Sequence, residues 1–397
     1  MRETIKSVAV GLMLGMLVAG VFAAGYYARD AVQFVNRSAE EGFISYGLLN
    51  EVQVILEQSY LRALPPAQVR EYAAIRGLLS SLEDRNTFLI DPPVAASEQH
   101  VLLGTYGGIG VSIRRDEQGA IILTPFADGP AARAGIVEGD RLIAVNGVAV
   151  QLTDGLDSID QSMRGEVGNN NGVAVTVASI SGEEKTFFIP FEVIVIPSII
   201  WRVLEEDARI GYVHLLRFTE RTPSELDEAL ADLIGQGVKA VVIDVRNNGG
   251  GLLQQSVDVA GAFISEGVIA HEINRNGEIR YETRSGGLGE SLAVVVLINE
   301  RTASAAEIVA GAIQDYERGT VIGQRTFGKG TMQRIYQLSD GSSIHVTFAE
   351  WLTPNRRSID RQGIIPDIEM IPDINGRDVE LGEAIRVLRQ VLQEGAQ

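Results

Sequence analysis

Ala240-Val-Val-Ile-Asp-Val-Arg-Asn-Asn-Gly-Gly-Gly251 is the stretch that decides the fold. Its first half is a nearly continuous apolar run, which is typical of a strand buried on both faces of a parallel sheet. The glycines that follow free the backbone to turn its N–H groups inward at the carboxyl end of the strand, where ligands gather in α/β sheets. The stretch therefore predicts a buried strand with a candidate binding turn at its end.

Two interpretations of the glycine turn stay open. In one, Gly250 or Gly251 donates a backbone N–H to a carbonyl oxygen that becomes negative during a reaction, as in an oxyanion hole. In the other, the turn only joins a strand to a helix. Phosphate binding is disfavoured, because the sequence contains neither G-x-x-x-x-G-K-[ST] nor G-x-G-x-x-G at this point.

The order of strand and helix repeats on both sides of this stretch. Such alternation predicts an α/β core with largely parallel strands, and an Asp-Gly turn after it predicts a hairpin. The predicted strands are 210–215, 292–298 and 320–323, the helices are 223–234 and the one that Ser304 opens, the hairpin pairs 332–338 with 343–348, and a short amphipathic helix covers 379–392.

The chain before this core contains two segments with different sequence patterns. From Glu41 to Leu82 apolar residues recur at three-to-four spacing on both sides of Pro65-Pro66, which predicts a pair of helices. From Gly104 onward, short strands alternate with glycine turns. Gly107-Gly-Ile-Gly-Val-Ser-Ile113 and the segment Gly129–Gly147 together resemble a PDZ domain.

A PDZ domain binds the carboxyl terminus of another chain by adding it as a strand to the edge of a sheet. We predict that the loop formed by Gly108, Ile109, Gly110 and Val111 binds that terminus, with the N–H groups of the last three directed at the carboxylate. The alternative is that these glycines only make a tight hairpin.

The amino terminus has the pattern of an export segment. Arg2 and Lys6 precede an uncharged run from Ser7 to Ala28 that is long enough to span a bilayer as a helix. The flanking charges place the following residues outside the cytoplasm. Val21-Phe-Ala23 also resembles a cleavage site for a signal peptide. We favour an uncleaved membrane anchor; both interpretations predict an extracytoplasmic protein.

Composition excludes several classes of function. The chain has 397 residues, enough for two or three domains, and a net charge of −18, which argues against nucleic acid as a partner. It has no cysteine, which excludes thiolate zinc sites, a cysteine nucleophile and disulfides. Its four histidines show no metal-ligand spacing, so we expect no metal.

Three residues suggest hydrolysis by a serine–lysine pair. Ser304 opens a helix, where the N–H of Ala305 and the helix dipole would face a developing negative charge. Lys329, in Phe327-Gly-Lys-Gly330, could take the serine proton if a dry site lowers its pKa. Gln333 would share a face with Lys329 in an extended segment and could orient its amine. Each residue also has a non-catalytic interpretation: Ser304 as a helix cap, Lys329 as a solvated loop lysine and Gln333 as a surface glutamine.

In this order and behind a PDZ pattern, the motifs resemble the carboxyl-terminal processing peptidases, or tail-specific proteases. The resemblance rests on the segments already quoted, on Thr302-Ala-Ser-Ala-Ala-Glu-Ile-Val-Ala-Gly311, on Gly323–Gln333, and on Trp351-Leu-Thr-Pro-Asn with Gly363-Ile-Ile-Pro-Asp. It implies that Ser304 is the nucleophile, Lys329 the general base and Gln333 its orienting partner, with an oxyanion hole of Ala305, Gly250 and Gly251.

The resemblance also implies properties that spacing alone does not. The core would be of the crotonase and Clp-protease type, no cofactor would be needed, and a homodimer would be expected. Arg164 would sense a bound substrate tail from within the PDZ domain. One departure is Gly249, which stands where the family often has proline. The implied boundaries are 1–29 for the signal anchor or signal peptide, 30–98 for the helical region, 99–190 for the PDZ domain, 191–372 for the peptidase core and 373–397 for the carboxyl-terminal helical segment.

Two other function classes remain as alternatives. A PDZ scaffold on an inactive core would not need Ser304, Lys329 and Gln333 together. A crotonase-like acyl-group enzyme would use backbone oxyanion donors, but it would have no use for a PDZ domain. The sequence therefore favours an extracytoplasmic serine endopeptidase that acts on proteins or peptides with exposed carboxyl-terminal tails.

Overall fold

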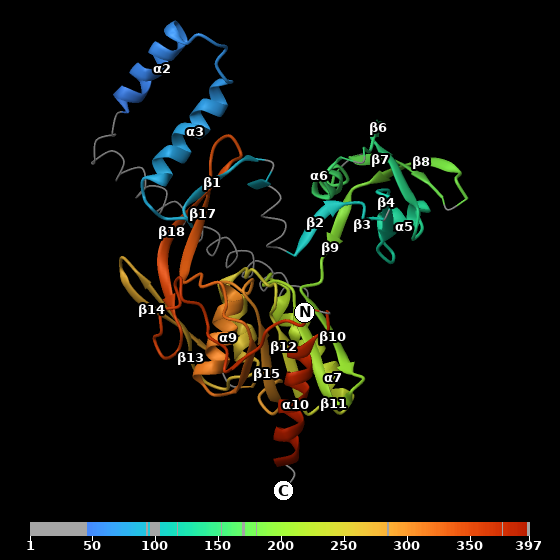
Figure 1. Ribbon diagram of the computed structural model, residues 1–397, viewed down its shortest axis with the longest axis vertical. Helices are drawn as coiled ribbons and strands as arrows, with labels where there is room; N and C mark the ends of the chain where they lie inside the picture. Colours follow the sequence, from blue (N-terminus) through green and yellow to red (C-terminus); the bar gives the residue numbers. More distant parts are fainter. Residues whose placement is uncertain are drawn as a thin grey trace, which may run out of the picture. The chain divides into compact units, whose positions relative to one another are not determined.

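The computed structural model describes residues 46–394 except 93, 96–103, 117, 152, 169–170, 180, 284–285 and 375 (Figure 1). The chain divides into two compact units between Ala73 and Ala74. The first contains helix α2 (Gly47–Ser59) and the start of α3 (Ala67–Ser80). Arg70 of α3 forms an ion pair with Glu57 of α2 at 2.9 Å. These helices are the pair that the spacing of apolar residues predicts.

A six-stranded sheet forms the centre of the second unit. Its inner strands pair in parallel, and only its first strand runs antiparallel to its neighbour. The α/β prediction is therefore confirmed. In order across the sheet the strands are β10 (Ile199–Leu204), β11 (Asp207–Leu215), β12 (Ala240–Asp244), β15 (Ala293–Ile298), β16 (Gly319–Gly323) and β19 (Ile368–Glu369).

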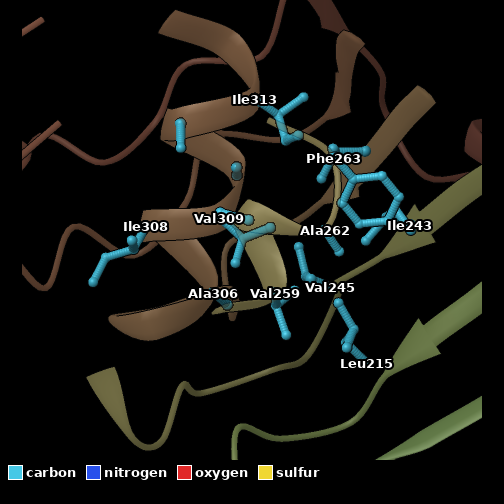
Figure 2. Close-up of a cluster of buried hydrophobic side chains, with 14 of the residues drawn as sticks. Leu215, Ile243, Val245, Val259, Ala262, Phe263, Ala306, Ile308, Val309 and Ile313 are labelled. Atoms are coloured by element: carbon cyan, nitrogen blue, oxygen red, sulfur yellow. The ribbon is translucent and has the colours of Figure 1, made fainter. Parts of the chain in front are cut away.

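Strand β12 is buried on both faces, as its apolar sequence predicts. Val241 and Ile243 belong to a core shared with α7 (Thr222–Gly235), α8 (Leu253–Gly261) and α9 (Ala305–Asp315). Figure 2 shows Ile243 and Val245 in this core with side chains of α8 and α9. Val242 points to the other face, which α10 (Val379–Glu394) covers. Each buried aliphatic side chain contributes about 1.5–3 kcal/mol, so both helical layers stabilise the sheet.

A second, antiparallel sheet carries the predicted hairpin. Strands β17 (Thr331–Gln337) and β18 (Ser343–Leu352) pair with an extra residue in β18, because Met332 lies opposite Ala349 and Gln333 opposite Thr347. The other strands of this sheet are β1 (Phe88–Ile90), β13 (Gly267–Asn274) and β14 (Gly277–Thr283).

The PDZ-like segment has its own sheet and its own core of buried residues, among them Leu123 and Val173. Strand β3 lies at the edge of the sheet, where a peptide strand could be added. A separate pair, β2 (Thr105–Gly108) with β9 (Glu192–Val195), extends past residue 190. The remaining elements are β3 (Val111–Arg115), β4 (Ile121–Pro125), α5 (Pro130–Ala134), β5 (Arg141–Val145), β6 (Val148–Ala149), α6 (Leu156–Ser162), β7 (Gly172–Ala178) and β8 (Glu184–Pro190).

The predicted membrane anchor at Ser7–Ala28 lies outside the residues that the structure describes. Among the described residues, none of the helices combines the length and the apolar character that crossing a bilayer requires.

We expect Leu230→Ala in α7 to lower the free energy of unfolding by about 2–5 kcal/mol, because it leaves a cavity in the core. Leu230 is 0% exposed, whereas Ile234 on the same helix is 39% exposed. Ile234→Ala is the matched control and should cost much less. Urea titration measures both, and equal losses would contradict this assignment of the buried face.

Candidate active site

Ser304 occupies a strained position between β15 and α9. Its backbone has φ 56° and ψ −120°, which is costly for a residue with a side chain, at about 1–3 kcal/mol. It is partly exposed, while Ala303 and Ala305 on either side are buried. The N–H of Ala303 is held by the carbonyl of Asn248 at 2.9 Å. The strand-to-helix turn therefore places Ser304 at the start of a helix with part of its surface exposed.

A buried carboxylate, Glu307, links this serine to the lysine loop. Glu307 Oε2 accepts the backbone N–H of Ser304 at 2.8 Å and that of Lys329 at 2.9 Å. Its Oε1 accepts the hydroxyl of Thr326 at 2.5 Å and the N–H of Gly328 at 2.7 Å. One fully buried side chain thus fixes the backbone of both predicted catalytic residues.

Sequence analysis did not single out Glu307, although a signal was present. Serine followed three residues later by glutamate is the pattern of a capping box, in which the glutamate accepts the N–H of the cap residue. The pattern predicts the bond from Ser304. The bonds from the lysine loop are not local, and no spacing predicts them.

The glycine turn approaches Ser304 very closely. Gly250 has φ 102°, and a Cβ atom there would lie 2.8 Å from Ser304 Cβ and 2.9 Å from the carbonyl oxygen of Ala303. Gly251 has φ 145°, and a Cβ there would lie 2.0 Å from the carbonyl oxygen of Phe218. Both positions therefore require glycine for conformation and for space.

The two glycines differ in what their N–H groups do. The N–H of Gly250 donates to Asn248 Oδ1 at 2.9 Å. The N–H of Phe218 donates to the carbonyl of Gly250, and the carbonyl of Phe218 accepts the N–H of Leu252. The N–H of Gly251, between these two bonds, therefore points away from Phe218. In the described part of the chain, the N–H groups of Gly251 and Ala305 donate to no protein group. These two N–H groups are therefore the candidates for an oxyanion hole, and Asn248, whose side chain holds the turn, is a residue that the sequence patterns did not single out.

Lys329 is anchored through its backbone. Its N–H donates to Glu307, and its carbonyl accepts the indole N–H of Trp351 at 3.0 Å. Gln333 lies in β17, where its amide nitrogen donates to the hydroxyls of Thr331 at 2.9 Å and Thr347 at 3.3 Å. With this orientation of the amide, its oxygen is the acceptor that a lysine amine would use.

One cavity of about 400 Å³ brings the predicted catalytic residues together. Its walls are both polar and apolar, its lining includes the cationic side chains of Arg217 and Lys329, and none of its described lining residues is a carboxylate, in a chain whose net charge is −18. Among the residues that line the cavity are Gly250, Gly251, Ser304, Ala305, Lys329, Gln333, Leu253, Ile308, Met332 and Trp351.

The predicted carboxylate-binding loop is held within the PDZ-like segment. The carbonyl groups of Ile109 and Gly110 accept N–H groups of Ala131 and Phe126, each at 2.9 Å, and Gly110 has φ 70°. These bonds to the loop's carbonyl groups fix its shape. Val111 then begins the edge strand β3.

Arg164 lies beside the same loop. It forms an isolated bridge with Gly108 and an ion pair with Asp160 at 2.5 Å. Its guanidinium carbon lies 4.1 Å from the ring centroid of Tyr106 in β2. Arg164 is thus bound within its own module.

Comparison with known proteins gives consistent matches. Residues 209–370 match the profile of Peptidase family S41, and residues 121–170 match that of the PDZ domain. The chain is 34% identical over 322 residues to a carboxyl-terminal-processing protease of Synechocystis sp., covering 79% of this chain and 74% of that one. It is 32% identical over 379 residues to a carboxy-terminal-processing protease of Bartonella bacilliformis, covering 92% and 85%.

A solved structure from Bacteroides fragilis, described as an S41 protease, has the same fold. Its TM-score is 0.52 with 16% identity, and the match covers 83% of this chain and 93% of that one.

We expect Glu307→Gln to lower kcat for peptide cleavage at least about tenfold, because misplacement of reacting groups is costly. The amide NH₂ must replace one carboxylate oxygen, so it would face the N–H of either Gly328 or Lys329, and that buried N–H would lose its acceptor. Glu300→Gln, on the exposed part of the preceding loop, is the control. Unchanged kinetics in Glu307→Gln would contradict the role assigned to this carboxylate.

The acidic side of the pH–rate profile should report Glu307. Burial raises its pKa above the ordinary 4.5, although four donors oppose the shift. A protonated carboxyl would place an O–H donor against the N–H groups that it now accepts. Activity should therefore be lost as the pH is lowered, and the midpoint of this loss should lie above pH 4.5. Thr326→Val removes a donor that lowers this pKa and should move the loss to higher pH, while Thr326→Ser should not. Equal profiles for the two variants would contradict the assignment.

Lowering the pH should change the contribution of Glu307 to folding stability in the opposite direction to its effect on activity. Because its pKa is raised in the folded state, the folded protein binds more protons than the unfolded chain as the pH passes through that window. Its contribution to stability is therefore present in acid and lost as the pH rises. The melting temperature should not fall together with the activity if Glu307 alone is responsible.

Proposed function

Because this chain belongs to peptidase family S41 and is a serine-type peptidase of the carboxyl-terminal processing kind, we propose that Ser304 is its nucleophile and Lys329 its general base. The observation that carries this proposal is the carboxylate of Glu307, which holds the backbone of both residues at the same cavity. A shared anchor of this kind is what a proton transfer between their side chains requires.

The proposed reaction follows from these positions. Lys329 Nζ takes the proton of Ser304 as Oγ attacks the peptide carbonyl. The N–H groups of Ala305 and Gly251 stabilise the negative oxygen, and the start of α9 adds its dipole. Lys329 then gives the proton to the leaving amine, and a water activated by the same amine hydrolyses the acyl-enzyme. Gln333 orients the amine throughout.

We further propose that the PDZ domain selects substrates with an exposed carboxyl-terminal tail. The edge strand β3 would pair with the tail, and the N–H groups of Ile109, Gly110 and Val111 would bind its terminal carboxylate. Arg164, in contact with Gly108, would respond to the bound tail.

The cellular setting belongs to the same proposal. The segment Ser7–Ala28 would anchor the protein in the membrane or direct its export, which places the peptidase outside the cytoplasm. We also propose that the protein acts as a homodimer and needs no metal. A catalytically inactive PDZ scaffold is the alternative function.

We expect Ser304→Ala to abolish cleavage of a peptide with an apolar carboxyl-terminal tail by the full-length protein. Lys329→Arg should abolish it as well, because a guanidinium stays protonated at the assay pH. Gln333→Ala should lower kcat in part, and a metal chelator should have no effect. Mass spectrometry of the products measures each result, and the pH–rate profile should show a base that ionises well below roughly 10.4.

Three outcomes would contradict the proposal. Cleavage that survives in Ser304→Ala would exclude the nucleophile, and cleavage that a chelator stops would exclude a metal-independent mechanism. An inactive wild-type protein that still binds the tail peptide would support the scaffold.

Amidation of the peptide terminus should raise KM, since it removes the carboxylate that the PDZ loop would bind.

A further inference from the structure

We propose that Asp378, at the start of the carboxyl-terminal helix, is a positioning residue for the oxyanion turn and acts through Arg246. The inference rests on the proposed function, because it concerns the turn that would stabilise the oxyanion. It assigns a catalytic consequence to a helix that contributes no residue to the active-site cavity.

The guanidinium of Arg246 joins two carboxylates by hydrogen bonds, and a third carboxylate, that of Glu380 in α10, lies 3.7 Å from its Nη1. Its Nη1 and Nη2 donate to the two oxygens of Asp378, each at 2.8 Å, in a bidentate pair. Its Nη2 also donates to Asp244 Oδ2 at 2.6 Å. Tyr212 donates to the same oxygen of Asp244 at 2.7 Å. The side chains of Arg246 and Asp244 are 16% and 2% exposed, whereas that of Asp378 is 42% exposed, so the ion pair is shielded from water on the side of Asp244 and reaches the surface at Asp378.

The ion pair between Arg246 and Asp378 favours the charged form of both side chains. Burial opposes ionisation of Asp378, but the bonds from Arg246 and from the N–H of Leu381 hold its pKa below the usual value. Burial also opposes the charge of Arg246, and Asp378 and Asp244 outweigh it and raise the pKa of the guanidinium. Bidentate pairs of this kind fix orientation as well as distance.

Arg246 lies directly before the oxyanion turn. Asn247, the next residue, has φ 60° and exchanges two hydrogen bonds with Asn299, at 2.9 and 3.0 Å. Asn248 follows: its side chain holds the N–H of Gly250, and its carbonyl holds the N–H of Ala303, next to Ser304. A rotation of the chain at Arg246 would therefore move the glycine turn and the residue that precedes the nucleophile.

Asp378 is fixed in turn by the helix that it begins. Its Oδ1 accepts the N–H of Leu381 at 3.0 Å, as a helix cap does. Ala384, Ile385 and Leu388 of α10 pack against β12 and β15 in a buried cluster. The helix is thus seated on the sheet by apolar contacts, and Asp378 transmits its position to Arg246.

The same helix provides a matched control at its other end. Arg389 Nε donates to Asp207 Oδ2 at 3.1 Å, and Arg389 also bonds the carbonyl of Glu206. Asp207 begins β11, whereas Asp244 ends the parallel strand β12, so these two ion pairs lie at opposite ends of two neighbouring strands. Only the pair with Arg246 adjoins the oxyanion turn.

The test compares Asp378→Asn with Arg389→Gln in the full-length protein. Asparagine keeps the helix cap and the shape but removes the charge. We expect kcat to fall about tenfold to a hundredfold with KM unchanged, as for a small misplacement of catalytic groups. The affinity for a peptide aldehyde, whose adduct with Ser304 places an oxyanion in the hole, should fall by a similar factor. Asp378→Glu should restore most of the activity.

Arg389→Gln should lower the melting temperature about as much as Asp378→Asn and leave kcat and aldehyde affinity unchanged. Parallel losses of kcat in the two variants would overturn the proposal, because they would mean that Asp378 only seats the helix. Normal kcat in Asp378→Asn would also overturn it. Should Asp378→Asn not fold, Asp378→Ser, which also keeps a cap, takes its place with the same expectations.

Failure of this inference is distinguishable from failure of the proposed function. If Ser304→Ala still cleaves peptides, the mechanism itself is wrong. If Ser304→Ala is inactive and Asp378→Asn has normal kinetics, the mechanism stands and only the role of Asp378 is lost.

Discussion

The buried carboxylate of Glu307 is the interaction on which the geometry of the site depends. Ser304 opens α9 and Lys329 lies in the loop before β17, so no single element fixes their separation. Glu307 accepts a backbone N–H from each of them. A hydrogen bond to a charged group is worth about 1.5–3 kcal/mol, so displacement of either residue is opposed. The link is made to the backbone of both residues and not to the hydroxyl or the amine.

The same carboxylate helps to maintain the strain at Ser304. A positive φ at a serine persists only where the surroundings determine it. Here Glu307 holds the N–H of Ser304 itself, and Asn248 holds that of Ala303. On the opposite side, Gly250 approaches so closely that any side chain would collide with Ser304. Glycine at this position therefore makes room for Ser304, the proposed nucleophile, as well as allowing the conformation of the turn itself.

Local patterns predicted much of the fold and the central residues of the site. The apolar run of β12 and the Asp-Gly hairpin were predicted correctly, because each signal lies within a few residues. The motif residues Ser304, Lys329 and Gln333 do line one cavity. What the sequence could not show are the links between distant segments. Glu307 and Lys329 are 22 residues apart, and Arg246 and Asp378 are 132 apart, so no periodicity relates them.

The position of α10 shows why such links are needed. Both faces of a parallel sheet must be covered, and α10 supplies the apolar cover for Val242 and its neighbours. Apolar packing seats the helix on the sheet, but it is non-directional and does not by itself orient a side chain beyond the end of the strand. A bidentate ion pair is directional and orients the guanidinium of Arg246 relative to the helix. The pair formed by Arg246 and Asp378 therefore turns a helix that stabilises the core into one that also sets the position of the oxyanion turn.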